Sequence, residues 1–129
     1  MPLSELRDRR ILVVEDEYLV AVSLCEALQD AGSQVIGPVA SVDTAIQAID
    51  ARPQIDAAVV DINLGGIKAY VVADLLLARS IPFIFTSGYE QDALTARYPS
   101  IRNCQKPYAM ATIGVALAGA MREARTGGG

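Results

Sequence analysis

The chain has 129 residues, which is the length of one ordinary domain and leaves little room for a second DNA-binding or catalytic domain. Hydrophobic residues make up 52% of the chain and charged residues 20%, a balance that favours a packed globule over a disordered chain. The net charge of −4, with no visible basic patch, disfavours binding to nucleic acid or to an anionic membrane surface.

Targeting signals and metal-binding cysteine motifs are missing from the sequence. The apolar stretch VVADLLLA at 71–78 is too short to span a membrane, and the polar start MPLSELRDRR lacks the apolar segment of a signal peptide. We therefore expect a cytoplasmic protein without membrane contact. The chain has no histidine and no CxxC motif, which gives a zinc or redox site little support. Cys25 and Cys104 could be buried apolar residues or a bridge.

Short apolar runs alternate with helical patterns along the first half of the chain. The runs ILVV (11–14), QVIGPV (34–39) and DAAVVD (56–61) predict the first three strands. The first helix stops at Gly32, and Ser41 is expected to cap the second. A third helix is predicted from about Ile67 to Arg79, which would include Lys68.

The second half continues the same alternation with shorter elements. IPFIFTS (81–87) predicts a fourth strand, 89–99 at most a brief helix, RNCQK (102–106) a fifth strand, and the segment before the TGGG tail a last helix. Strands that alternate with helices imply right-handed crossovers and a parallel sheet covered on both faces. We expect a three-layer, doubly wound (βα)5 sandwich with a five-stranded parallel sheet and a shortened fourth helix.

Polar residues gather where the predicted strands end. Strand one is followed by Glu15 and Asp16, strand three ends at Asp61, strand four at Thr86-Ser87, and strand five at Lys106. Because the carboxyl ends of parallel strands share one edge of the sheet, these side chains should converge, and ligands bind at that edge in such folds.

Each of these residues also has a purely structural interpretation. Asp16 could cap the first helix, and Asp61 could be an Asx-turn residue before Asn63. Ser87 could belong to a simple turn, and Lys106 could be a solvated loop lysine. These interpretations do not explain why all of the residues fall at one edge.

Three clustered carboxylates require raised pKa values or a bound cation. Two unit charges about 5 Å apart repel by about 3 kcal/mol at an effective dielectric constant of 20. A site with few oxygen ligands and room for water suits Mg²⁺, which we expect as the cofactor. The metal could bridge to a phosphoryl group whose other oxygens contact Lys106 and the Ser87 hydroxyl.

The pieces LVVEDE, VVDINL, IPFIFTSGY and CQKPY resemble the receiver domain of two-component response regulators, and the resemblance covers nearly the whole chain. It implies the strand order 2-1-3-4-5, a single receiver domain over 1–129 with its core at about 9–125, and no effector domain. It also implies a partner that donates phosphate, either a histidine kinase or a histidine phosphotransfer protein, and a downstream signalling protein that receives the output.

The resemblance assigns a role to each residue at the strand ends. Asp61 would be the phosphoacceptor and attack the phosphorus of a phosphohistidine. Asp61 and Asp16 would ligate Mg²⁺ directly, Glu15 through a water, and Asn63 through its backbone carbonyl. Lys106 would pair with Asp61 and then with the phosphoryl oxygens. The hydroxyl of Ser87, or alternatively that of its neighbour Thr86, would bind the phosphoryl group.

The segment IPFIFTSGY is similar to a narrower subgroup, the mostly single-domain regulators with a PFxFATGY (FAT GUY) motif. Thr86-Ser87 replaces the Ala-Thr of that motif. Most receivers also carry a mobile aromatic residue three positions before the lysine, where this chain has Asn103. Tyr89 could report on the phosphorylated state instead, or it could be a half-buried ring at a helix start; both interpretations stay open.

The leading hypothesis is a phosphoacceptor, not an enzyme with a separate substrate, although it could catalyse its own dephosphorylation. One alternative is a pseudo-receiver that binds partners without being phosphorylated. Another is a phosphohydrolase of the haloacid dehalogenase type, but that family needs Asp-x-Asp after strand one, where this chain has Glu15-Asp16-Glu17. A flavin-binding module is disfavoured because the same acidic residues replace a phosphate-cradling loop.

Overall fold

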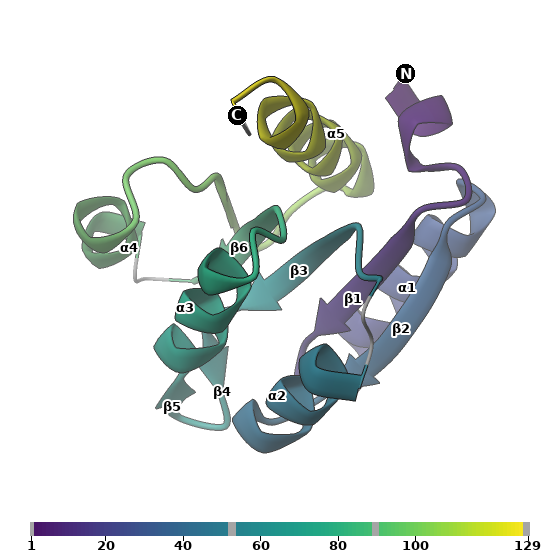
Figure 1. Cartoon of the computed structure of the whole chain (residues 1–129). Coiled ribbons are helices and arrows are strands. Elements are labelled where there is room, and N and C mark those ends of the chain that lie inside the picture. Colours follow the sequence, from purple (N-terminus) through teal and green to yellow (C-terminus); the bar gives the residue numbers. More distant parts are fainter. Residues whose placement is uncertain (1, 52–53, 89–90, 128–129) are drawn as a thin grey trace.

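The computed structural model describes residues 2–51, 54–88 and 91–127, and Figure 1 shows the arrangement of their elements. In chain order they are η1 (Pro2–Leu6), β1 (Arg10–Val14), α1 (Tyr18–Asp30), β2 (Gln34–Val39), α2 (Val42–Ala51), β3 (Ala57–Asp61), β4 (Asn63–Leu64), β5 (Ile67–Lys68), α3 (Tyr70–Ala78), β6 (Phe83–Ser87), α4 (Gln91–Arg97), β7 (Asn103–Gln105) and α5 (Met110–Gly127). Strands and helices alternate as the sequence predicts.

Five of the strands form one parallel sheet in the order β2-β1-β3-β6-β7. This order confirms the predicted 2-1-3-4-5 arrangement, since β6 and β7 are the fourth and fifth strands of this sheet. Helices lie on both sides of the sheet (Figure 1), which gives the predicted three-layer sandwich. The carboxyl ends of all five strands therefore lie at one edge.

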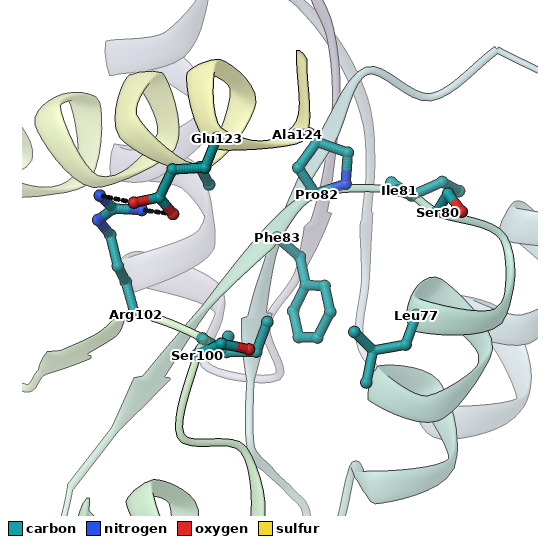
Figure 2. Close-up of a pocket in the computed structure, with 11 residues that line it drawn as sticks. Leu77, Ser80, Ile81, Pro82, Phe83, Ser100, Arg102, Glu123 and Ala124 are labelled. Carbon is teal, nitrogen blue, oxygen red and sulfur yellow. Dashed lines mark hydrogen bonds and ion pairs between the residues drawn. The ribbon is translucent and has the colours of Figure 1, made fainter. Parts of the chain in front are cut away.

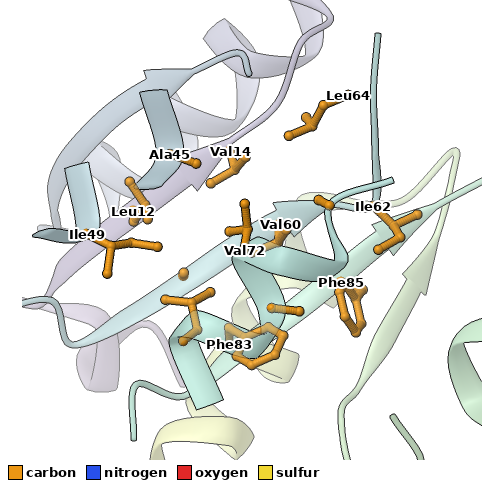
Figure 3. Packing of buried hydrophobic residues seen from close by; sticks show 14 of the residues in the cluster. Leu12, Val14, Ala45, Ile49, Val60, Ile62, Leu64, Val72, Phe83 and Phe85 are labelled. Carbon is orange, nitrogen blue, oxygen red and sulfur yellow. The ribbon is translucent and has the colours of Figure 1, made fainter. Parts of the chain in front are cut away.

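The central strands are buried on both faces because their side chains alternate between two apolar clusters. Figure 3 shows the cluster that faces α2 and α3, to which three neighbouring strands contribute Leu12, Val60 and Phe85. The neighbouring positions, such as Val13 and Val59, face α1 and α5 in the second cluster. This double burial explains why the strands are continuous apolar runs and fixes the position of each strand end.

A short β-hairpin replaces the predicted start of the third helix. β4 and β5 pair antiparallel around Gly65 and Gly66, whose φ angles are +60° and +88°. Positive φ at both central residues is what a two-residue type I′ turn requires and what glycine readily adopts. The helix begins at Tyr70 rather than at about Ile67, so the prediction that Lys68 lies on this helix is wrong.

The fourth helix is short, as predicted, and packs through the residues at its end. Tyr98 is buried next to Phe85, and its hydroxyl donates to Asp74 Oδ1 on α3 at 2.7 Å. The guanidinium of Arg97 lies 4.2 Å from the centre of the Tyr70 ring, a cation–π contact between α4 and α3. These contacts attach a single short helix to its neighbour.

The other local predictions agree with the structure, with small shifts at the element ends. Ser41 caps α2, since its Oγ accepts the Thr44 N–H at 3.2 Å. Leu6 of η1 is buried in the cluster that faces α1 and α5. Cys25 and Cys104 are both free and buried, so the bridge is excluded. No helix in the described ranges is long and apolar enough to cross a membrane.

Candidate functional site

The edge formed by the strand ends brings the three predicted acidic residues together. Glu15 and Asp16 directly follow β1, and Asp61 is the last residue of β3, its neighbour in the sheet. One carboxylate oxygen from each of the three lies within 4.8 Å of the others. Glu15 and Asp61 are almost completely buried, with 3% and 4% of their surface exposed, whereas Asp16 is exposed. The cluster is therefore open to solvent on one side.

Lys106 neutralises part of this charge. Its ammonium donates to Asp61 Oδ2 at 2.9 Å and lies 3.1 Å from Glu15 Oε1 and 3.2 Å from Glu17 Oε1. Burial disfavours the ammonium, but the hydrogen bond and charge of Asp61, followed by those of Glu15, outweigh burial and raise the pKa of Lys106 above its usual value. The lysine thus stays protonated and holds two buried carboxylates together.

Glu15 is the acid whose protonation the site changes most. Its pKa is raised from 4.5 to about 7, mainly by burial, and the hydrogen bond and negative charge of Asp61 act in the same direction. The backbone N–H of Glu17 and the ammonium of Lys106 act in the opposite direction. A cation bound beside this carboxylate would favour its charged form.

This raised pKa predicts that the metal-free protein loses stability as the pH rises. In the folded state Glu15 keeps its proton up to about pH 7, whereas in the unfolded chain it releases it near 4.5. Between these values the folded state binds more protons, so the free energy of unfolding falls with rising pH, by at most about 3 kcal/mol. Urea unfolding in a chelating buffer at about pH 5 and about pH 8 measures the loss.

The variant Glu15→Gln should flatten this pH dependence because its amide does not titrate. Glu26→Gln, which changes an exposed carboxylate on α1, is the matched control and should leave the dependence unchanged. An unaltered slope in Glu15→Gln would assign the pH effect to another group.

Asp16 contacts the β4–β5 hairpin instead of capping the first helix. Its Oδ2 accepts the backbone N–H of Gly65 at 2.7 Å. The N-cap of α1 is Glu17, whose side chain makes no capping hydrogen bond. The capping interpretation of Asp16 is therefore wrong, and the glycine turn has a second function, which is to present an N–H to this carboxylate.

Asp61 is both an Asx-turn residue and a partner of Lys106, so its structural and functional interpretations are compatible. Its Oδ1 accepts the backbone N–H of Asn63 at 3.0 Å, which is the Asx-turn contact, while Oδ2 accepts the Lys106 ammonium. The two contacts fix the orientation of the carboxylate. Asn63 itself is exposed in β4, and a ligand role for its backbone carbonyl stays a prediction.

The two hydroxyl residues at the end of β6 differ in their partners. The Ser87 hydroxyl is fully buried and donates to Asn103 Oδ1 on β7 at 2.8 Å. Thr86 Oγ1 is buried without a hydrogen-bond partner in the described part of the chain. Alternation along β6 directs Ser87 to the same face as Phe85 and Thr86 to the opposite face. Tyr89, the third predicted switch residue, lies outside the described residues.

The structure adds two contacts that sequence reasoning missed. Glu17 pairs with Lys106, and Asn103 accepts the Ser87 hydroxyl. The acidic run at 15–17 could have indicated the contact between Glu17 and Lys106, because a third carboxylate beside two others is stabilised by a nearby cation. The second depends on the register between β6 and β7, which no sequence pattern here specifies.

The carboxylate cluster fits a bound cation by its chemistry. Its donors are all oxygens, and the Lys106 ammonium does not balance the charge of three ionised carboxylates. Hard divalent cations prefer such ligands. Glu15, Asp16 and Asp61 could therefore hold a metal ion.

A groove of about 580 Å³ at the other end of the sheet is not part of this site. Figure 2 shows it between Phe83 at the start of β6, Leu77 of α3 and Glu123 of α5. The groove contains the carboxylate of Glu123, which accepts hydrogen bonds from Nη1 and Nη2 of Arg102 at 2.7 and 2.9 Å. The groove offers no clustered acids.

Comparisons with known proteins give matches among solved structures only, because no protein-family model and no curated protein matches. SdrG from Sphingomonas melonis Fr1 is 36% identical over 89% of this chain and 97% of its own, with a TM-score of 0.77. A response regulator receiver protein from Sinorhizobium medicae WSM419 is 24% identical over 92% and 98%, with a TM-score of 0.83. The signal receiver domain of a modulated diguanylate cyclase from Desulfovibrio desulfuricans G20 is 26% identical over 93% and 98%, with a TM-score of 0.80.

The doubly wound parallel sheet, with acids and a lysine at its strand ends, has the architecture of response regulator receiver domains. The identity of more than a third over nearly the full length of SdrG extends this likeness from fold to family. The chain belongs to the receiver-domain family of response regulators.

Proposed function

We propose that the chain is a phosphoacceptor in a two-component phosphorelay, with Asp61 as the residue that is phosphorylated. The observation that carries the proposal is a buried Asp61 carboxylate held 2.9 Å from the Lys106 ammonium, beside the oxygens of Glu15 and Asp16. An Asp61 oxygen attacks the phosphorus of a phosphohistidine, the P–N bond breaks, and the imidazole leaves while an acyl phosphate forms.

Each residue of the site supports one part of this transfer. Lys106 holds the carboxylate in place and then follows the phosphoryl oxygens, whose charge its ammonium offsets. The Ser87 hydroxyl donates to another phosphoryl oxygen. Mg²⁺ is the proposed cofactor, held by Glu15, Asp16, Asp61 and the Asn63 carbonyl, and it supplies positive charge against the phosphoryl oxygens.

The proposed donor is a histidine kinase or a histidine phosphotransfer protein. A groove of about 640 Å³ lies directly beside Lys106, and part of its lining is apolar: Leu19 from α1, Tyr108 from the segment before α5 and Met110 from the start of α5. Tyr18 and Leu19, at the start of α1, each expose 77% of their surface. An apolar rim next to a charged site suits docking of a partner protein that brings its phosphohistidine to Asp61.

The finer assignment is to the PFxFATGY subgroup, with Thr86-Ser87 in place of Ala-Thr. We propose a cytoplasmic protein that signals by altered binding to a downstream protein or by removing phosphate from a shared relay. The acyl phosphate would be lost by intrinsic autodephosphorylation. The switch role proposed for Tyr89 belongs to this assignment.

Phosphorylation of the purified chain tests the proposal. With Mg²⁺ and a small phosphoramidate or acyl phosphate donor, intact-protein mass spectrometry should detect one added phosphoryl group that is labile to hydroxylamine. A chelator should prevent the addition, because the acids of the site then repel the incoming anion. No addition at any Mg²⁺ concentration, together with no transfer from histidine kinases of the host, would favour the pseudo-receiver.

A further inference from the structure

The Ser87 hydroxyl already has an acceptor other than a phosphoryl group. Its Oγ lies 2.8 Å from Asn103 Oδ1, and Ser87 has no exposed surface. The strand register pairs Phe85 with Asn103, so the Asn103 side chain emerges from β7 on the face that Ser87 occupies on β6. The contact is therefore built by adjacent strands of the sheet.

The amide of Asn103 is only half used in this arrangement. Its oxygen accepts the serine hydroxyl, but its Nδ2 is buried and has no hydrogen-bond partner among the described residues. A buried amide nitrogen without a partner is unfavourable, so this arrangement of Asn103 lowers the stability of the unmodified state. The geometry of Asn103 therefore suits a hydrogen bond to Ser87 that forms in one state of the site and breaks in another.

A serine hydroxyl has one proton and can donate it to one strong acceptor at a time. We propose that Asn103 is a positioning residue that holds the Ser87 hydroxyl while Asp61 is unmodified and is released when Ser87 turns its proton to a phosphoryl oxygen. This inference rests on the proposed function. The release frees the Asn103 amide on the edge strand β7, which also supplies the Gln105 amide that donates to the Gly88 carbonyl at 3.3 Å.

The proposal predicts the effect of Asn103 on binding of a phosphoryl mimic. Beryllofluoride with Mg²⁺ needs no kinase, and its dissociation constant can be measured by calorimetry. Asn103→Ala should bind it about 2- to 10-fold more tightly than the wild type, the factor that one neutral hydrogen bond represents. Gln105→Ala also removes an amide from β7, but that amide donates to the Gly88 carbonyl and not to the Ser87 hydroxyl, and the change should alter the constant less than about twofold.

A double-mutant cycle separates this role from a general effect on the fold. In a Ser87→Ala background the hydroxyl is gone, so adding Asn103→Ala should leave the dissociation constant unchanged within about twofold. An equal gain in both backgrounds, or weaker binding by Asn103→Ala alone, would overturn the proposal. If the wild type itself binds no beryllofluoride, the proposed function falls and this inference falls with it.

A measurement on the wild type does not depend on how the variants fold. The buried Ser87 hydroxyl proton should exchange slowly with water, and the side-chain amide signals of Asn103 should shift on saturation with beryllofluoride. Amide signals that stay in place when the site is saturated would show that Asn103 keeps its partner, which contradicts the proposal while leaving the proposed function intact.

Discussion

Asp61→Asn should reduce phosphoryl incorporation by at least about 10³-fold, because the neutral amide oxygen is a poor nucleophile compared with a carboxylate. The replacement has nearly the same shape and can still accept the Asn63 N–H through its carbonyl oxygen. Intact-protein mass spectrometry with Mg²⁺ and a phosphodonor measures the loss. Equal incorporation in the variant would show that another residue is the acceptor.

The variant should remain folded, so the loss cannot be attributed to unfolding. Removing the Asp61 charge takes away one cause of the raised pKa of Glu15, and Lys106 keeps Glu15 and Glu17 as partners. Thermal unfolding followed by circular dichroism checks this point. Asp43→Asn, an exposed aspartate in the first turn of α2, is the matched control and should be phosphorylated like the wild type.

The sheet could be predicted from the sequence because each central strand is buried on both faces. Such strands appear as continuous apolar runs, and DAAVVD and IPFIFTS are apolar for this reason. The hairpin was missed because strands of two residues are too short to show a periodicity, and Ile67 followed by Val71 and Val72 has helical spacing. The Gly-Gly pair was the available signal, since a two-residue turn favours it.

The positions of the site residues followed from one rule, that parallel strands end at the same edge. This rule predicts that Glu15, Asp16 and Asp61 lie together, and in the structure their carboxylates do. The rule says nothing about hydrogen-bond partners. That Ser87 faces Asn103 depends on the register between β6 and β7, and the short run RNCQK does not determine a register.

Asn103 departs from the family pattern, and the structure gives this departure a physical meaning. In the sequence, Asn103 occupies the position where most receivers have an aromatic residue. The sequence does not indicate which interaction Asn103 makes in place of that residue. The structure gives it a specific partner, the Ser87 hydroxyl, at the strand end nearest the proposed phosphoryl site. A residue of different chemistry thus occupies this position and contacts the Ser87 hydroxyl.

Lys106→Met should destabilise the metal-free protein by about 2 to 4 kcal/mol at about pH 8, because it leaves two buried carboxylates without their cation. The loss should be smaller at about pH 5, where Glu15 keeps its proton and no longer needs a cation. Urea unfolding at both pH values, in a chelating buffer, measures the difference. Arg125→Met, which removes an exposed cation near the end of α5, should change the stability little at either pH.

Added Mg²⁺ should recover much of the stability lost in Lys106→Met, since a divalent cation beside the acids replaces the missing positive charge. Mg²⁺ should stabilise this variant more than it stabilises the wild type. In the wild type the Lys106 ammonium already offsets part of the negative charge of Asp61 and Glu15. Phosphorylation of the variant should nevertheless stay slow. The metal offsets the charge of the carboxylates, but it does not replace the contact that the Lys106 ammonium makes with the phosphoryl oxygens during the transfer. A variant as stable as the wild type without metal at about pH 8 would mean that the carboxylates are not held by Lys106.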